Sequence, residues 1–333
     1  MGQSNTKLVK PVRLDLNTAP FLNEAAIRRA FETAKFEELA TYPEKDAPLL
    51  TNQLAEVLGV PQEAVLVGNG SDEILDLAAR ALVPPGGSLG ILHPSFSSYE
   101  HIANSNRLKI VRVTAGKQLP VSKLVSTHAD CWFLASPNNP TGTALTQEDL
   151  ESLLNQLQAP ILIDEAYAEF ANQDFRQIAA DSSRVIVTRT FSKAYGLPGI
   201  RVGYAVAPPR VIAKLREIKM PYNISTISEQ VALAAISDNS FVSRVVTTVL
   251  SQRQFLFEKL SNDGWPVWPS QANFLLVGPL RDAAGVQAAL RKQGILVKLI
   301  DYPGENLGQS LRITIGTEAQ NALLLEALGR VVT

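Results

Sequence analysis

The hydrophobic residues of this chain follow two alternating spacings. Short apolar runs, most of them unbroken, predict strands at residues 89–92, 108–113, 132–135, 161–164, 185–188 and 202–206. Unbroken runs are typical of strands that are covered on both faces. Apolar residues at helical spacing lie between the runs, as in the helix after Ser71 and in the leucine-rich helix capped by Thr146. Strands that alternate with helices predict an α/β fold with a mostly parallel sheet.

The pattern changes on both sides of this region. Residues 1–23 have few signals of regular structure and predict an extended arm, whereas residues 24–39 and 49–58 have helical spacing. A long helix is expected at 240–260. It is followed by short strands at 274–277, 295–298 and 311–315 and by helices near 283–293 and 318–331.

These changes predict two domains. Residues 40–237 form the large domain, with its mostly parallel central sheet flanked by helices. Residues 238–333, together with the arm and helix of residues 1–39, form a smaller α+β domain. Ligands of open α/β sheets bind beyond the carboxyl ends of the strands, so we expect the chemistry there.

Composition and charge exclude several classes of protein. The chain has 31 basic and 32 acidic side chains and no basic run, so no nucleic-acid partner is expected. No apolar run approaches the ~18 residues of a membrane helix, and the start of the chain lacks the apolar stretch of a signal peptide. The single cysteine, Cys131, allows no disulfide within the chain, which suits a cytoplasmic location. The three histidines lack metal-ligand spacing, so no metal is expected.

Residues 188–203 bring together several reactive groups. Lys193 is flanked by the hydroxyls of Thr190 and Ser192, and Arg201 follows after two glycines and a proline. A lysine amine forms a Schiff base with an aldehyde, while hydroxyls and an arginine bind a phosphate. The segment therefore fits a cofactor with both groups, such as pyridoxal phosphate. A solvated Lys and Arg beside a glycine turn remains the alternative interpretation of this segment alone.

Other candidate residues follow the predicted strands. An aspartate at the end of a buried strand, Asp164, is costly unless it is paired, and a pyridinium nitrogen is a suitable partner. Tyr167 lies three residues further on, and Asn139 offers an amide in the loop after residue 135. Phe96 can stack on a planar ring or pack in the core. The glycine turn at residues 68–70 leads into a helix for which Ser71 is the predicted N-cap, and a helix N-terminus is an anion site.

Taken together, these segments resemble the fold-type I pyridoxal-phosphate enzymes, and within them the histidinol-phosphate aminotransferase family. The resemblance covers nearly the whole chain. It rests on LDLNTAPF, TYPEKD, VGNGSDE, HPSFSSY, SPNNPTG, IDEAYAEF, RTFSKAYGLPGIRVGY, PYNIS, QANFLLV and SLRITIGT, in this order. The family activity implied is transfer of an amino group from histidinol phosphate to a 2-oxo acid, expected to be 2-oxoglutarate, in histidine biosynthesis.

The resemblance also implies roles for individual residues. Lys193 forms the Schiff base and moves protons, Asp164 pairs with the pyridinium nitrogen, and Tyr167 with Asn139 contacts the phenolic oxygen of pyridoxal 5′-phosphate. Implied further contacts to the cofactor come from Phe96, Ser71, Asp72, Thr190, Ser192 and Arg201 and, in a homodimer with shared active sites, from Tyr42 of the partner subunit. The implied substrate-binding residues are Arg312, Lys298 and Asn17.

Two departures from the family pattern bear on the substrate. The family segment LNENP is here Leu16–Pro20, reading LNTAP, and Lys298 stands where an arginine often helps to hold the substrate phosphate. A lysine lacks the bidentate fork of arginine. Three alternatives therefore stay open: an aromatic amino-acid aminotransferase, a threonine-phosphate decarboxylase of cobalamin synthesis, and a non-catalytic cofactor-binding protein.

Overall fold

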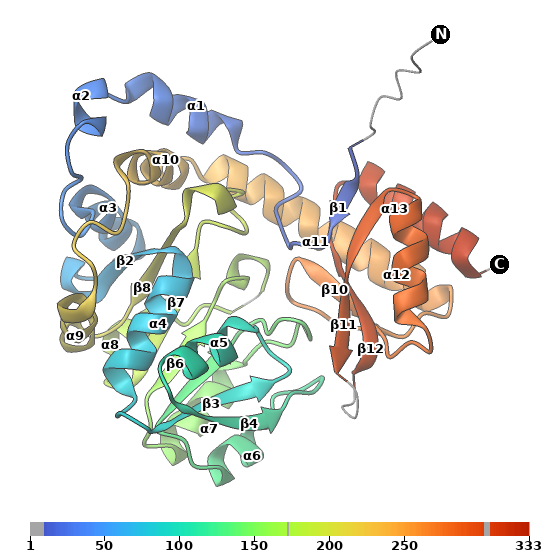
Figure 1. Cartoon of the computed structure of the whole chain (residues 1–333), viewed down its shortest axis with the longest axis horizontal. Coiled ribbons are helices and arrows are strands. Elements are labelled where there is room, and N and C mark those ends of the chain that lie inside the picture. Colours follow the sequence, from blue (N-terminus) through green and yellow to red (C-terminus); the bar gives the residue numbers. More distant parts are fainter. Residues whose placement is uncertain (1–9, 172, 303–306, 333) are drawn as a thin grey trace.

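The strands of the chain form two separate sheets, as seen in the computed structural model, which describes residues 10–171, 173–302 and 307–332 (Figure 1). The larger sheet has the strand order β2-β8-β7-β6-β5-β3-β4. Its strands are β2 (Val65–Asn69), β3 (Ser88–His93), β4 (Lys109–Thr114), β5 (Cys131–Ala135), β6 (Ile161–Asp164), β7 (Val185–Thr190) and β8 (Val202–Val206). Only β8 among these runs antiparallel to its neighbours, so the predicted mostly parallel sheet is confirmed.

The smaller sheet has the strand order β1-β11-β12-β10-β9. Its strands are β1 (Val12–Leu14), β9 (Val267–Trp268), β10 (Phe274–Val277), β11 (Ile295–Tyr302) and β12 (Gly308–Thr314). The prediction that the whole N-terminal arm is irregular was wrong for β1, whose three residues pair in parallel with β11. Three residues are too few to show the alternation of apolar and polar positions that predicts a strand. They form one because β11 supplies the hydrogen-bonding partner. Residues 1–9 of the arm lie outside the described residues.

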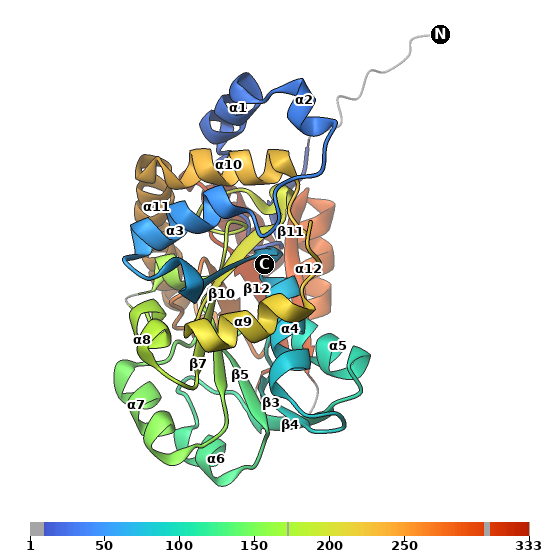
Figure 2. The same ribbon diagram turned by 90° about the vertical axis from the view of Figure 1, so that its left-hand side faces the viewer.

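Helices cover both sheets (Figure 2). They are α1 (Glu24–Thr33), α2 (Phe36–Leu39), α3 (Pro48–Leu58), α4 (Gly70–Leu82), α5 (Ser98–Ser105), α6 (Val121–Ser126), α7 (Gln147–Gln156), α8 (Arg176–Asp181), α9 (Pro209–Ile218), α10 (Thr226–Ile236), α11 (Asn239–Asn262), α12 (Ala283–Lys292) and α13 (Glu318–Val332), with short 3₁₀ turns at Gln62–Ala64, Ala168–Phe170 and Pro198–Ile200. The helix predicted at 24–39 is interrupted, because Ala34 and Lys35 have extended backbones that separate α1 from α2. The predicted capping by Thr146 is confirmed as a capping box with Asp149.

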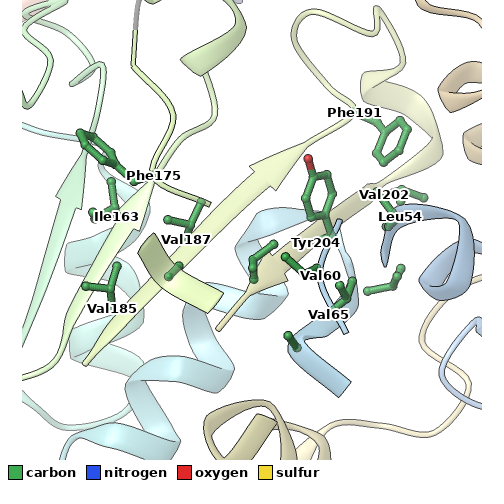
Figure 3. Close-up of a cluster of buried hydrophobic side chains, with 14 of the residues drawn as sticks. Leu54, Val60, Val65, Ile163, Phe175, Val185, Val187, Phe191, Val202 and Tyr204 are labelled. Atoms are coloured by element: carbon green, nitrogen blue, oxygen red, sulfur yellow. The ribbon is translucent and has the colours of Figure 1, made fainter. Parts of the chain in front are cut away.

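Alternate residues of the central strands belong to different hydrophobic clusters. Ile163 and Val187 pack in the cluster of Figure 3, together with Phe175 and Tyr204, whereas Leu162 and Ile186 pack in the cluster under α4 and α5. Burial on both faces explains why these strands read as unbroken apolar runs. Because side chains alternate, Asp164 extends the same face as Leu162, which places it at the end of the α4 side of the sheet.

The two sheets are connected through α11 and the N-terminal arm. The arm places β1 on the edge of the small sheet and then reaches α1, which packs against α10 (Figure 1). Residues of the arm therefore lie beside both parts of the chain. The domain division at residues 40 and 238 stays a prediction.

Candidate active site

A cavity of about 170 Å³ lies at the carboxyl ends of β5, β6 and β7, beside the start of α4. Its lining residues are Ser71, Asp72, Phe96, Ala135, Pro137, Asn139, Asp164, Ala166, Tyr167, Thr190, Ser192, Lys193, Pro198 and Arg201. Every residue predicted to contact the cofactor within one chain is among them. The cavity also lies where open α/β sheets bind ligands.

Asp164 lies at the buried end of the cavity and is only 3% exposed. The hydroxyl of Tyr99 donates to its Oδ2 at 2.8 Å, and the hydroxyl of Thr188 and the backbone N–H of Ala166 donate to its Oδ1 at 3.3 and 3.2 Å. Burial raises the pKa of Asp164 to about 6. The hydrogen bonds act in the opposite direction and lower it, but burial is the larger effect. A buried carboxylate is stabilised most by a cationic partner in the cavity, which compensates for its lost contact with water.

The start of α4 and the side chain of Arg201 form the end of the cavity away from Asp164. Arg201 adopts a left-handed backbone with φ 52°, and its guanidinium donates to Ser192 Oγ at 3.4 Å and to Asp72 Oδ2 at 3.1 Å. A Cβ on Gly203 would lie 2.5 Å from the backbone nitrogen of Ser71, so only glycine allows this close approach. Hydroxyls, a helix N-terminus and an arginine together suit a phosphate.

The prediction that Ser71 is the N-cap of this helix was wrong. The helix begins at Gly70, with Asn69 in the cap position, and Ser71 lies in the first turn. The backbone N–H of Asn69 donates a hydrogen bond to the Glu73 carboxylate, and the helix starts two residues earlier than predicted. Ser71 nevertheless remains in the cavity wall.

Lys193 also lines the cavity. Its Nζ is 5.4 Å from the centre of the Tyr167 ring and donates to the backbone oxygen of Leu16 at 3.4 Å. The half-buried Phe96 also lines the cavity and contacts the Tyr99 ring edge-on, with ring centres 5.6 Å apart. An amine thus lies within one cavity that has a carboxylate at one end and phosphate-binding groups at the other.

Arg312 reaches the site from β12 of the small sheet. Its Nη1 donates to Asn139 Oδ1 at 2.6 Å and its Nη2 to the backbone oxygen of Asp15 at 2.7 Å. Its buried Nε has no hydrogen-bond partner among the described residues. Lys298 on β11 is directly opposite Arg312 in the antiparallel register, so both side chains are on the same face of the small sheet.

Asn17 and Tyr42, like Arg312 and Lys298, lie outside the cavity lining. Asn17 is 1% exposed, and its Nδ2 donates to the Tyr167 hydroxyl at 3.0 Å. Tyr42 is 82% exposed, stacks on Tyr222 with ring centres 5.0 Å apart, and borders a separate surface pocket with α10. Their predicted contacts with substrate and with a partner's cofactor stay predictions.

The sequence analysis missed three groups that touch the site. Tyr99 and Thr188 hold the Asp164 carboxylate, and the backbone oxygen of Asp15 accepts from Arg312. Tyr99 ends the HPSFSSY segment and Thr188 ends a predicted strand, so both had a positional signal. A backbone acceptor such as Asp15 has no signal in a sequence.

No helix in the described part of the chain is long and apolar enough to cross a membrane.

Comparison with known proteins agrees with this geometry. The family model for aminotransferase class I and II matches residues 9–328. The chain is 34% identical to histidinol-phosphate aminotransferase 1 of Nostoc sp. over 330 residues, which covers 98% of this chain and 93% of that protein. The chain belongs to the class I and II aminotransferases.

Solved structures have the same fold. Histidinol-phosphate aminotransferase from Sinorhizobium meliloti, in complex with pyridoxal-5′-phosphate, superimposes with a TM-score of 0.89 at 25% identity and covers 97% of this chain and 91% of its own. L-threonine-O-3-phosphate decarboxylase from Porphyromonas gingivalis reaches a TM-score of 0.84 at 23% identity, with coverage of 96% and 99%. The fold-type I architecture is therefore confirmed, but the fold alone does not separate these two activities.

The chain is a pyridoxal-phosphate-dependent aminotransferase, and the cavity fits this cofactor. The buried Asp164 would pair with its ring nitrogen, the start of α4 with Arg201 would hold its phosphate, and Lys193 would supply the amine. The absence of Cβ atoms at Gly70 and Gly203 leaves room at the phosphate end, where a Cβ would lie within 2.6 Å of Arg201 Nη2 or 2.5 Å of Ser71 N.

Proposed function

We propose that this chain transfers an amino group from histidinol phosphate to a 2-oxo acid, expected to be 2-oxoglutarate, in histidine biosynthesis. The observation that carries the proposal is the half-buried guanidinium of Arg312 beside the cavity, whose buried Nε has no partner among the described residues, with Lys298 on the same face. Two neighbouring cations suit an amino donor with a phosphate and an acceptor with two carboxylates. The 34% identity to a protein named for this activity supports the choice of donor.

The polar and aromatic residues of the site have these proposed roles. Lys193 carries the cofactor, Asp164 binds its ring nitrogen, Tyr167 and Asn139 bind its phenolic oxygen, and Phe96 stacks on its ring. The phosphate is bound by Ser71, Asp72, Thr190, Ser192 and Arg201. Arg312 and Lys298 bind the anionic groups of the substrates.

The bound cofactor supplies an aldehyde that takes up the amino group and a ring that accepts electrons. The ionised carboxylate of Asp164 holds the ring nitrogen protonated, which keeps the ring electron-withdrawing. Lys193 Nζ takes a proton from the substrate Cα and returns one, acting as base and then as acid. Arg312 fixes the substrate anion so that the Cα–H bond faces Nζ.

The half-reaction tests this proposal. The cofactor-loaded protein is mixed in separate cuvettes with histidinol phosphate, phenylalanine and glutamate, and the visible absorbance reports conversion of the cofactor from its aldehyde to its amine form. Fastest conversion with histidinol phosphate is expected. Lys193→Ala serves as the control, since it removes the amine and should abolish turnover. Turnover retained by this variant would refute the role of Lys193. If no donor converts the cofactor, the chain is only a cofactor-binding protein.

A second candidate is an aromatic amino-acid aminotransferase. Lys298 favours it, because a lysine at this position gives no bidentate bond to a phosphate. Faster conversion with phenylalanine than with histidinol phosphate would select this function. Release of carbon dioxide from phosphothreonine would instead select the decarboxylase activity of the P. gingivalis relative.

We further propose a cytoplasmic homodimer in which Tyr42 contacts the cofactor phosphate of the partner subunit. The supporting observation is the exposed aromatic pair of Tyr42 and Tyr222, with Leu49 62% exposed near it. Large apolar side chains on one surface are typical of a subunit interface. The single buried Cys131, which can form no disulfide, is compatible with the cytoplasm. Sedimentation of the wild-type protein and of Tyr42→Ala tests the dimer.

A further inference from the structure

A chain of hydrogen bonds determines where the hydroxyl hydrogen of Tyr167 points. The backbone N–H of Asn17 donates to Thr314 Oγ1 at 3.0 Å, and the Thr314 hydroxyl donates to Asn17 Oδ1 at 3.1 Å. Asn17 Nδ2 then donates to the Tyr167 oxygen at 3.0 Å. A tyrosine hydroxyl has one hydrogen and two lone pairs, so this bond occupies a lone pair and leaves the hydrogen available for the cavity.

The opposite orientation of the Asn17 amide is unfavourable. With the amide turned over, Thr314 Oγ1 would accept from both the backbone and the side chain of Asn17. Its own hydrogen would then have no acceptor among the described residues, although Thr314 is only 2% exposed. A buried donor without an acceptor is destabilising, because it has lost its hydrogen bond to water. The backbone N–H, which can only donate, therefore sets the direction of the whole chain.

Asn17 is held where it cannot easily turn. It is 1% exposed, its backbone is left-handed with φ 54°, and its carbonyl oxygen accepts from Asn273 Nδ2 at 3.0 Å. Asparagine is among the few residue types that adopt this backbone readily. Asn17 is also not one of the described residues that line the cavity, whereas Tyr167, to which it donates, is one of them.

The two residues before Asn17 hold two other site groups. The Leu16 carbonyl accepts from Lys193 Nζ and the Asp15 carbonyl from Arg312 Nη2, at 3.4 and 2.7 Å. The pairing of β1 with β11 anchors the segment immediately before them. Three consecutive arm residues therefore contact an amine, a guanidinium and a phenol of the same site.

We infer that Asn17 is a positioning residue that acts through Tyr167. Its amide makes the Tyr167 hydroxyl a hydrogen-bond donor toward the cavity. This inference rests on the proposed function, in which Tyr167 binds the phenolic oxygen of the cofactor. A donor at that oxygen stabilises the more negatively charged form of the bound cofactor and so lowers the pH at which its visible absorbance changes.

The test is a pH titration of the visible absorbance of the cofactor-loaded protein, with no amino donor present. Tyr167→Phe removes the donor and should raise the midpoint by about one pH unit. Asn17→Asp places an accepting oxygen beside the hydroxyl, turns its hydrogen away from the cavity, and should raise the midpoint by a similar amount. Asn17→Leu leaves the hydroxyl free to turn and should give a smaller rise.

The charge of the new aspartate is measured separately in the Tyr167→Phe background, where no hydroxyl is left to turn. We expect Asn17→Asp to raise the midpoint there by less than half as much as in the wild-type protein. An equal rise in both backgrounds would overturn the inference. Thr314→Val, which removes the hydroxyl that orients the amide, gives a second test that adds no charge and should shift the midpoint only when Tyr167 is present.

Asn23→Asp is the matched control, because Asn23 is another buried asparagine of the arm and bonds to the backbone oxygen of Tyr195 instead. It should leave the midpoint unchanged. An unchanged midpoint in the Asn17 variants, with a raised KM for the amino donor, would make Asn17 a substrate contact and refute the inference alone. A wild-type protein without a visible cofactor band would refute the proposed function and the inference with it.

Discussion

The hydroxyl of Tyr99 lies 2.8 Å from Oδ2 of Asp164 and donates a hydrogen bond to it in the interior of the protein. Tyr99 is completely buried and Asp164 is 3% exposed, so neither group exchanges this bond for water. Tyr99 comes from α5 and Asp164 from β6, which makes the bond a link between the helix after β3 and the floor of the cavity. The orientation of the Asp164 carboxylate therefore depends on a residue outside the cavity wall.

Replacement of this tyrosine should weaken cofactor binding. In Tyr99→Phe, Oδ2 of Asp164 loses its donor, and the pKa of the carboxyl is expected to go further above about 6. Less of the carboxylate is then ionised at neutral pH, so we expect a roughly tenfold higher Kd for pyridoxal phosphate. Titration of the cofactor-free protein by fluorescence measures this Kd. Tyr302→Phe, outside the cavity lining, is the control, and an unchanged Kd in Tyr99→Phe would contradict the role.

The stability of the cofactor-free protein should depend on pH through Asp164. Burial raises the pKa of its carboxyl in the folded protein from 3.8 to about 6. Its contribution to the free energy of unfolding is therefore fully present below pH ~3.8 and is lost as the pH increases through 6, by at most about 3 kcal/mol. Urea unfolding between pH 4 and 7 should show this loss in the wild-type protein and not in Asp164→Asn. Parallel curves for the two proteins would exclude it.

The sequence analysis located the residues at strand ends well, because the apolar runs that predict strands also mark where they stop. Asp164 was found in this way, and it lines the cavity. Lys193 and Arg201 follow one of these strands, with glycines and a proline that indicate a tight turn. These residues are close in sequence, so local patterns are enough to group them.

Relationships between distant segments were harder to predict. The bond between Asn17 and Tyr167 joins residues 150 positions apart, and no local pattern indicates it. Strand β1 is a strand only because β11 lies beside it. The start of α4 was misplaced by two residues because Glu73, rather than Ser71, accepts from the N–H group before the helix.

The phosphate end should be sensitive to a single methyl group. In Gly203→Ala, the new Cβ would lie 2.5 Å from Ser71 N and 2.7 Å from the carbonyl carbon of Gly70, so the start of α4 must move. We expect at least a tenfold higher Kd for inorganic phosphate and for pyridoxal phosphate. Gly199→Ala is the matched control, because nothing lies within 4 Å of its Cβ position. Equal Kd values for the two variants would show that α4 does not form the phosphate site.

Lys298 should discriminate between amino donors. Its side chain is exposed and faces the same side of the small sheet as Arg312, so it acts as a point charge partly screened by water. Lys298→Ala is expected to lower kcat/KM for histidinol phosphate about fivefold to tenfold and to leave that for phenylalanine unchanged. Lys298→Arg should restore or exceed the wild-type value. An equal fall in kcat/KM for both donors would mean that Lys298 does not bind the phosphate.

Arg312 should be the substrate anchor that tolerates no replacement. Its guanidinium is fixed by the Asn139 side chain and the Asp15 carbonyl, and its buried Nε is left without a partner among the described residues. Burial lowers the pKa of this arginine because it disfavours the charged form. An anion bound beside the guanidinium stabilises the charged form again. Arg312→Lys keeps a positive charge but loses the planar fork, and we expect kcat/KM for the amino donor to fall about a hundredfold.

The effect on the cofactor should be much smaller, because Arg312 reaches it only through Asn139. Arg253→Lys is a suitable control, since Arg253 is also buried by its neighbours but bonds to the backbone oxygens of Phe170 and Ala272. Steady-state kinetics with the donor varied, alongside the Kd for pyridoxal phosphate, separate the two effects. If Arg312→Lys lost cofactor and substrate affinity equally, the arginine would belong to the cofactor site, and the substrate anion would need another partner.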